Sequence, residues 1–136
     1  MGIMAILATV VLAAVNPARQ FAQARDTERV SHVNTILNAI GERIADHSGI
    51  FEDGCGVNPV PTSTTPIKSS VGGYNLYNCL VPTYVSLLPT DPKSGRFTSA
   101  SDYDTGYTIV ADPVTARITI SAPTTEIGTT TISASR

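Results

Sequence analysis

Residues 3–15 read IMAILATVVLAAV, and residues 16–47 continue as NPARQFAQARDTERVSHVNTILNAIGERIADH. The first of these segments carries no charge and a single hydroxyl group, that of Thr9. A helix over it would be apolar on every side, whereas a helix on the surface of a soluble domain has a polar stripe. We therefore expect this segment to be surrounded by lipid or by other apolar helices.

The length of the apolar segment argues against a simple membrane-spanning helix. As a helix it would be about 20 Å long, shorter than the ~30 Å of hydrocarbon in a bilayer. A buried core helix and the apolar part of a signal peptide are the other interpretations. The signal peptide fits poorly because no Lys or Arg precedes the segment. The core helix fits poorly because the segment has no polar stripe.

The second segment has the signals of an amphipathic helix over residues 17–47. Asn16 is suited to cap this helix, and Pro17 is suited to its first position. A kink at Pro17 in one continuous helix is the alternative, with much the same outcome. Ser48 and Gly49 favour a stop, with Gly49 in a left-handed cap. One face is apolar at steps of three and four residues, through Val30, Val33, Ile36, Leu37, Ile40 and Ile44.

The two segments together are too long to be enclosed by the chain's own domain. A helical rod from Ile3 to His47 would be about 65–70 Å long at ~1.5 Å per residue. A globule of 136 residues has a radius of gyration of only about 14 Å. We therefore expect the first half of the rod to find partners elsewhere.

The rest of the chain changes character, because it is rich in Thr, Ser, Pro and Gly from Ser48 onward. We expect a loop over residues 48–105 and a sheet over residues 106–134. The predicted organisation is therefore an apolar helix segment, residues 1–16, followed by a globular domain, residues 17–136.

The sheet is expected to be antiparallel. In residues 106–122 apolar and polar positions alternate on both sides of the turn residues 112–115, DPVT, which indicates a β-hairpin. A third strand around residues 126–133 has a weaker signal. The apolar face of the helix would cover one face of this sheet. The expected fold is thus α+β, with a long N-terminal helix and a small antiparallel sheet on its C-terminal half.

Composition argues against several functions. With 9 Lys and Arg against 11 Asp and Glu, the net charge is −2, so no basic field is available for a nucleic acid. Two His and two Cys are too few for a four-ligand zinc site unless carboxylates contribute. His32 and His47 would lie more than about 20 Å apart on one helix. No nucleophile elbow, phosphate loop or metalloprotease motif occurs. We therefore expect neither an enzyme nor a resident cofactor.

The helix sequence resembles type IV pilins and pseudopilins. The resemblance is strongest over residues 3–47, where NPARQFAQARDTER at residues 16–29 matches the pattern N-P-x-x-Q-x-x-x-A-R-D-x-x-R. A second, weaker stretch covers residues 88–120. In it, LPTDPKSG at residues 88–95 and YDTGY at residues 103–107 resemble the loop and first sheet strand of the same group.

The resemblance implies a structural subunit of a type IV pilus-like filament with the pilin fold. Apolar helices of such subunits leave the lipid bilayer of the inner membrane, with the help of pilus assembly machinery, and pack into a helical homopolymer. The protein would reside in the inner membrane before assembly and in a cell-surface or periplasmic filament afterwards. Contacts in the filament core or the membrane would come from Ile3, Ile6, Leu7, Val10, Val11, Leu12 and Val15.

Two alternatives stay open. A pseudopilin of a type II secretion-type machine shares this fold and manner of assembly. A membrane-anchored extracellular binding module is of another class and would never polymerise. The family's processing signal, Gly followed by Phe-Thr-Leu-Ile-Glu, does not occur in the chain. We therefore expect the chain to begin downstream of the native N-terminus. His32 stands where relatives commonly carry Asp.

The resemblance also implies roles for two sets of side chains. In an extracytoplasmic protein Cys55 and Cys79 are expected to form a disulfide rather than remain two buried thiols. A band of charges follows the apolar segment and is either a solvated helix face or a set of contacts between neighbouring subunits. Its members are Arg19, Arg25, Asp26, Glu28 and Arg29.

Three aspartates of the C-terminal half are candidate calcium ligands. Asp91, Asp102 and Asp104 lie close together in the sequence, and some pseudopilins bind calcium in a comparable loop. The segment lacks the third ligand, the central Gly and the closing Glu of an EF-hand. We therefore favour exposed turn carboxylates, with a calcium site as the alternative.

Overall fold

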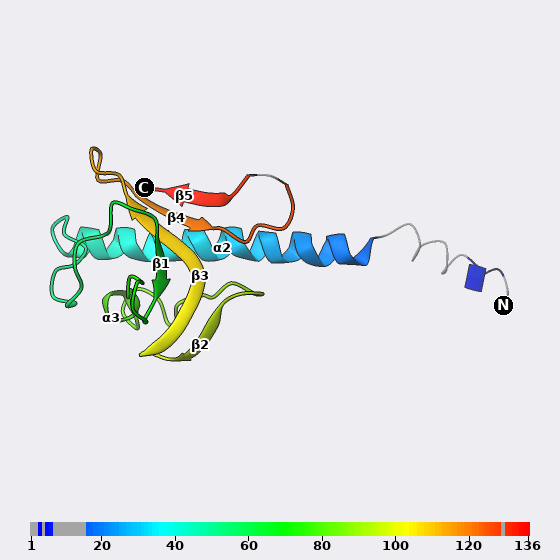
Figure 1. Ribbon diagram of the computed structural model, residues 1–136, viewed down its shortest axis with the longest axis horizontal. Helices are drawn as coiled ribbons and strands as arrows, with labels where there is room; N and C mark the ends of the chain where they lie inside the picture. The colour runs from blue at the N-terminus through cyan, green and yellow to red at the C-terminus, as the bar shows by residue number, and fades with distance from the viewer. Residues whose placement is uncertain (1–2, 4, 7–15, 129) are drawn as a thin grey trace.

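The computed structural model describes residues 3, 5–6, 16–128 and 130–136 (Figure 1). Within these residues the chain is α+β, with one long helix and a five-stranded antiparallel sheet packed on it, which confirms the predicted fold class. In chain order the elements are α2 (Pro17–Asp46), β1 (Thr65–Lys68), α3 (Tyr77–Leu80), β2 (Arg96–Ser99), β3 (Asp102–Ala111), β4 (Ile118–Ala122) and β5 (Ile132–Ser135).

Both ends of α2 follow the capping signals in the sequence. The Asn16 side chain accepts a hydrogen bond from the backbone N–H of Arg19 at 3.2 Å, and Pro17 occupies the first turn. At the other end, the N–H of Gly49 donates to the carbonyl of Ile44 at 2.8 Å, with Gly49 at a φ of 93°. The helix begins at the predicted residue and ends one residue earlier than predicted.

Strand β3 is the centre of the sheet. The strand order is β1-β3-β4-β5, β2 also pairs with β3, and these pairings are antiparallel. Strands β3 and β4 form the predicted hairpin, with Ala111 opposite Ile118. The Asp112 side chain closes the turn by accepting the N–H groups of Val114 and Thr115. The prediction of a hairpin is therefore confirmed.

The last strand begins later than predicted. β5 occupies Ile132–Ser135, whereas the sequence predicted a strand around residues 126–133. The backbone N–H groups of Glu126 and Ile127 donate to the Asp26 carboxylate instead of to a neighbouring strand. A backbone group that is already hydrogen-bonded to a side chain cannot also pair in a sheet, so the strand starts after this loop.

The prediction that residues 48–105 form a loop and that the sheet begins at residue 106 is wrong in part, because residues 48–105 contain β1, α3, β2 and the first residues of β3. The pairing of β1 with β3 is interrupted after Pro66. The N-terminal end of α3 is held by the Tyr103 hydroxyl, which accepts the N–H groups of Leu76 at 3.0 Å and Tyr77 at 3.3 Å. Each of these elements has four residues and is held by distant partners, so no periodic pattern announces it.

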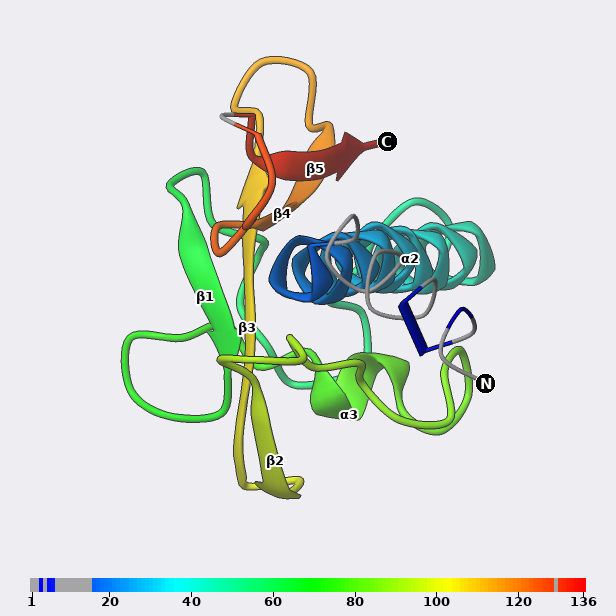
Figure 2. The same ribbon diagram turned by 90° about the vertical axis from the view of Figure 1, so that its right-hand side faces the viewer.

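The sheet wraps around one side of α2. Figure 2 looks along the helix and shows β4 and β5 on one side of it and α3 on another. The apolar stripe of the helix is buried as predicted, except that Val30 is 45% exposed and Ile44 is only partly buried. Arg29 takes the buried position that was expected for Val30. The buried residues of α2 are Asp26, Arg29, Val33, Ile36, Leu37, Ala39, Ile40 and Arg43.

Candidate functional site

The N-terminal part of α2 is the first candidate site, because it lies beyond the sheet. In Figure 1 the helix extends past β4 and β5 toward the N-terminus of the chain. Residues 16–24, which we call the exposed helix segment, are all exposed except the half-buried Ala22. Phe21 in this segment is 66% exposed. A large apolar side chain on an uncovered helix is available for contact with another molecule.

The structure describes only part of the apolar segment that precedes α2. Ile3 and Ile6 are helical, with 76% and 66% of their surface exposed. The other residues expected to contact lipid or sister helices lie outside the described residues: Leu7, Val10, Val11, Leu12 and Val15. Among the helical residues that the structure describes, no helix combines the length and the apolarity needed to cross a membrane.

A second candidate site lies where α2 meets the head, by which we mean residues 48–136. Arg29 is fully buried there. Its guanidinium donates to both carboxylate oxygens of Asp91, at 2.6 and 3.1 Å, and to one oxygen each of Asp26 and Glu126, both at 2.8 Å. Arg25 donates twice to Glu126, at 2.7 and 2.8 Å. We call these side chains the charged cluster.

Asp91 is the most firmly held anion of the charged cluster. Besides Arg29, it accepts the N–H groups of Lys93 and Ser94, both at 2.9 Å, and the Thr124 hydroxyl at 2.8 Å. Burial alone would raise the pKa of the Asp91 carboxyl, but these hydrogen bonds, that of Arg29 foremost, hold it well below its usual range. Asp91 is therefore an anion at every physiological pH.

The same cluster fastens the C-terminal loop to α2. The N–H groups of Glu126 and Ile127 donate to Asp26 at 3.0 and 2.7 Å. Burial opposes ionisation of Asp26, but these backbone hydrogen bonds and that of Arg29 keep its pKa below the usual value. Side-chain hydrogen bonds from Arg25 and Arg29 lower the pKa of Glu126 to about 2. The loop is thereby tied to one turn of the helix.

The charged cluster is chemically saturated. Within the described residues, no buried side-chain nitrogen or oxygen lacks a hydrogen-bond partner. Two guanidinium groups face three carboxylates, and the ammonium of Lys93 lies 3.5 Å from Glu126. A saturated network of this kind rigidifies the structure around it. The arrangement therefore acts as a clamp that sets how the head sits on α2, and it presents no free group for catalysis.

The expected roles of Asp26 and Arg29 are corrected by this geometry. Both were placed on a solvated helix face or at a contact between subunits, but their exposed fractions are 8% and 0%. The interpretation is wrong for these two residues because their partners, Asp91 and Glu126, come from the head of the same chain. These partners are 62 and 97 residues away from Arg29, so no local pattern in the sequence reveals them.

The other charges of the band are placed differently. Arg25 is half-buried against Glu126 and is therefore also engaged within the chain. Arg19 and Glu28 are exposed on α2. The expected subunit contacts at Arg19 and Glu28 stay predictions.

The three candidate calcium ligands are not gathered into one site. Asp91 belongs to the charged cluster, Asp102 pairs with Arg96 at 3.1 Å, and Asp104 accepts the N–H of Gly106 at 2.9 Å. In the part of the chain that the structure describes, no group of three or more His, Cys, Asp or Glu could hold a metal ion. The alternative of a calcium site thus has no ligand set in these residues.

The two cysteines and His32 make further contacts within the chain. Cys55 and Cys79 form the expected disulfide, which joins the segment after α2 to α3. The Nδ1 atom of His32 lies 2.7 Å from the Tyr107 hydroxyl, so this ring links α2 to β3. Its Nε2 atom lies 3.6 Å from Glu28. His32 is thus a contact residue between α2 and β3.

Arg43 was not singled out by the sequence, yet it is buried near the C-terminal end of α2. Its guanidinium donates to the carbonyl oxygens of Phe51 at 2.7 Å and Cys79 at 3.0 Å, and also to that of Asp53. Arg43 thus binds the backbone near both cysteines of the disulfide. Arg29 has the corresponding role for the loops at the other end of the head. The sequence signal that could have revealed this role is an arginine among the apolar positions in the last turns of α2.

Comparisons of the chain with protein-family models, with curated proteins and with solved structures find no match. The function must therefore be argued from the residues and their geometry. Two features bear on it: a helix that extends beyond its head, and a clamp that fixes the head to that helix.

Proposed function

We propose that the chain is a structural subunit of a type IV pilus-like filament with the pilin fold. The observation that carries the proposal is the exposed helix segment, which extends beyond the sheet with Phe21 66% exposed. It continues directly from residues 3–15, which carry no charge. Residues 3–15 would form a helix that is apolar on all sides, and such a helix needs lipid or another helix as its partner.

The arrangement of helix and head supports an open polymer. The exposed helix segment extends beyond one end of the head (Figure 1). A contact between that segment and a different surface of the next copy is heterologous, and its repetition without closure generates a fibre. The opposite charges of Arg19 and Glu28 would set the register between neighbours, and the head would coat the outside.

The charged cluster supports the same function. A helical polymer repeats one contact many times, so every copy must present its head at the same angle to its helix. Arg29 is fully buried and fixes loops around Asp91 and Glu126 onto α2. Before assembly the apolar helix would lie in the inner membrane, where assembly machinery would extract it into a cell-surface or periplasmic filament.

Immunogold electron microscopy of cells that produce the full chain tests this proposal. We expect antibodies against the head to decorate long surface fibres along their length. Short periplasmic fibres would instead identify the secretion pseudopilin. Label confined to membranes, with no fibre in sheared material, would contradict assembly and favour a membrane-anchored binding module.

A pair of variants makes the test specific to the helix. Phe21→Asp should lower the amount of labelled fibre at least tenfold, because a carboxylate cannot be buried between packed helices without a partner. Val114→Asp is the matched control, because Val114 is 90% exposed in the β3–β4 turn. Both variants should keep the circular dichroism of the unmodified chain. Equal fibre yields from the two would contradict the proposed contact.

A further inference from the structure

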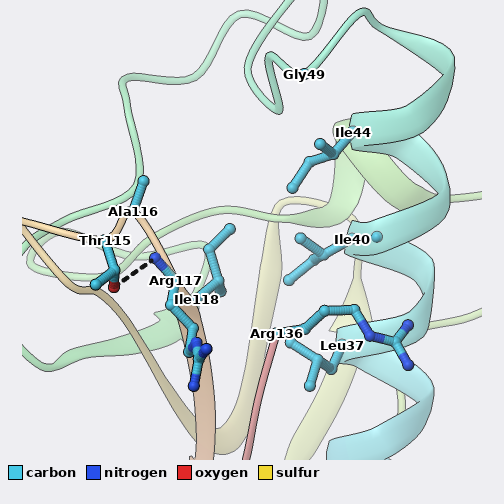
Figure 3. Close-up of a pocket in the computed structure, with 10 residues that line it drawn as sticks. Leu37, Ile40, Ile44, Gly49, Thr115, Ala116, Arg117, Ile118 and Arg136 are labelled. Carbon is cyan, nitrogen blue, oxygen red and sulfur yellow. Dashed lines mark hydrogen bonds between the residues drawn. The ribbon is translucent and has the colours of Figure 1, made fainter.

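An open groove lies between the C-terminal half of α2 and the edge of the sheet (Figure 3). Its volume is about 430 Å³, within the roughly 300–1,000 Å³ typical of ligand pockets. Figure 3 shows Leu37, Ile40 and Ile44 projecting from the helix toward Ile118 of β4. The helix wall is thus aliphatic, whereas the sheet wall combines Ile118 and Ala116 with Thr115 and two arginines.

A second hollow of about 200 Å³, lined in part by Phe51 and Val60, adjoins the groove. The two hollows share Ile44 and Ile118 in their walls. Because the residues shared by the two hollows include Ile44 and Ile118, the surface where they meet is aliphatic and suits an acyl chain.

The charges around the groove are unevenly distributed. Arg117 and Arg136 line the larger hollow and are exposed. Among the described residues, neither takes part in an ion pair. One carboxylate that Arg117 influences is Asp112, whose pKa is lowered by the N–H groups of its own turn and, to a lesser degree, by Arg117. Glu52 lines only the far hollow.

Gly41 determines where the Arg136 guanidinium lies. A Cβ atom at position 41 would be 3.4 Å from Nη1 and 3.5 Å from Cδ of Arg136. The arginine side chain therefore rests against the bare helix backbone at the edge of the groove. A larger side chain at Gly41 would displace this guanidinium and fill part of the groove.

We propose that this groove binds a free long-chain fatty acid. Its acyl chain lies along Leu37, Ile40, Ile44 and Ile118, and its carboxylate is bound by an exposed guanidinium at the rim of the groove, where Arg117 and Arg136 lie on different sides (Figure 3). Arginine is suited to this role because its planar donors match a carboxylate. The apolar segment of a second copy, residues 3–15, fits the charges less well, because it carries no carboxylate.

Photolabelling of the full chain in phosphatidylcholine nanodiscs tests the proposal. The probe is a dodecanoate with a diazirine at the end of its chain, and labelled residues are located by mass spectrometry. We expect label in residues 37–44 and 118–122, in addition to residues 3–15, which report partition into the bilayer. The matching dodecanol probe should label the groove at least fivefold less while labelling residues 3–15 equally.

Variants separate recognition of the head group from recognition of the chain. Arg117→Gln combined with Arg136→Gln should lower groove labelling by dodecanoate at least fivefold, whereas Arg96→Gln, which alters an exposed ion pair in another part of the sheet, should not. Gly41→Leu should also lower it at least fivefold, and Ala45→Leu, an exposed position of the same helix, should leave it unchanged.

Three results would overturn the proposal. They are equal groove labelling by the acid and the alcohol, label confined to residues 3–15, and unchanged labelling in the double arginine variant. The proposal would also be overturned if the groove, in the absence of the probe, is covered by a second copy of the chain and cross-links to it. The occupant would then be protein. The nanodisc assay does not require polymerisation, so its outcome is independent of the proposed filament.

Discussion

Arg29 is the residue on which the attachment of the head to α2 depends most. Replacing it by Ala leaves Asp91 buried without a counter-charge, and the loss of one partner of a buried ion pair costs about 3–5 kcal/mol. We expect the free energy of unfolding of Arg29→Ala, measured with urea at pH 7, to fall by that amount. Arg96→Ala removes an exposed ion pair and should change it by less than about 1 kcal/mol. Equal losses would contradict the role of the charged cluster.

The same cluster makes stability depend on pH. The folded pKa values of Asp91 and Glu126 lie below their reference values of 3.8 and 4.5, that of Glu126 at about 2. The stabilisation is therefore present above those reference values and is lost as pH falls through the folded pKa values. We expect the urea midpoint to be constant from neutral pH to about pH 5 and to fall steadily from there toward pH 2.

A variant separates this effect from general acid denaturation. Asp91→Asn cannot titrate at position 91, so its urea midpoint should be lower at pH 7 and should fall less between pH 5 and pH 2 than that of the unmodified chain. A midpoint of the unmodified chain that stays constant down to pH 2, or parallel curves for the two proteins, would contradict the assignment.

Gly106 allows β3 to approach the Asp91 loop closely. Its φ is 77°, and a Cβ atom there would lie 2.8 Å from Cβ of Asp91 and 2.9 Å from Oγ of Ser94. Gly128 has a φ of 83° with nothing within 4 Å of such an atom, so Gly128→Ala measures backbone strain alone, about 1–2 kcal/mol. Gly106→Ala should cost about 1–3 kcal/mol more in urea unfolding. Equal costs would mean that the close approach has no energetic role.

At the scale of elements, the disulfide compensates for the lack of regular structure in the head after α2. Cys55 and Cys79 are 24 residues apart. Of the strands that the structure describes, only β1 lies between them. Replacing both by Ser should lower the free energy of unfolding by about 3 kcal/mol. Treatment of the unmodified chain with dithiothreitol should reproduce that loss. A urea midpoint that is insensitive to reduction would contradict this role.

Elements with local signals could be predicted from the sequence. The cap at Asn16, the apolar stripe through Val33 and Ile40, and the turn at Asp112 each depend on residues near one another in the chain, and each is present. The short strands β1 and β2 could not be predicted, because they are held by pairing with β3 rather than by their own pattern.

The candidate site divides in the same way. The apolar sequence of residues 3–15 can be recognised at once, so it was identified as a contact surface, whereas the exposure of Phe21 in the exposed helix segment was not predicted. The charged cluster was misassigned, because Arg29 meets Asp91 and Glu126 only after the chain has folded. Arg29 lies next to Val33 on the apolar face of the helix. A charged residue in such a place is the sequence signal that a buried partner of opposite charge exists.

At the scale of the whole molecule, α2 has two functions along its length. From Asp26 onward it is covered by the head and carries the core, whereas residues 16–24 are uncovered. The charged cluster lies at the boundary between these parts and fixes the head relative to α2. This division is what a subunit needs if its helix is to pack with other copies while its head remains outside.

Photocross-linking from position 21 tests most directly whether the exposed helix segment meets copies of the same chain. The full chain is produced in cells with benzoylphenylalanine in place of Phe21, or in place of the fully exposed Val71 of the head as a control. We predict a ladder of cross-linked dimers, trimers and higher multiples from position 21, at least fivefold stronger than from position 71. Monomer alone from position 21, or a cross-link from it to the head of the same copy, would contradict the account.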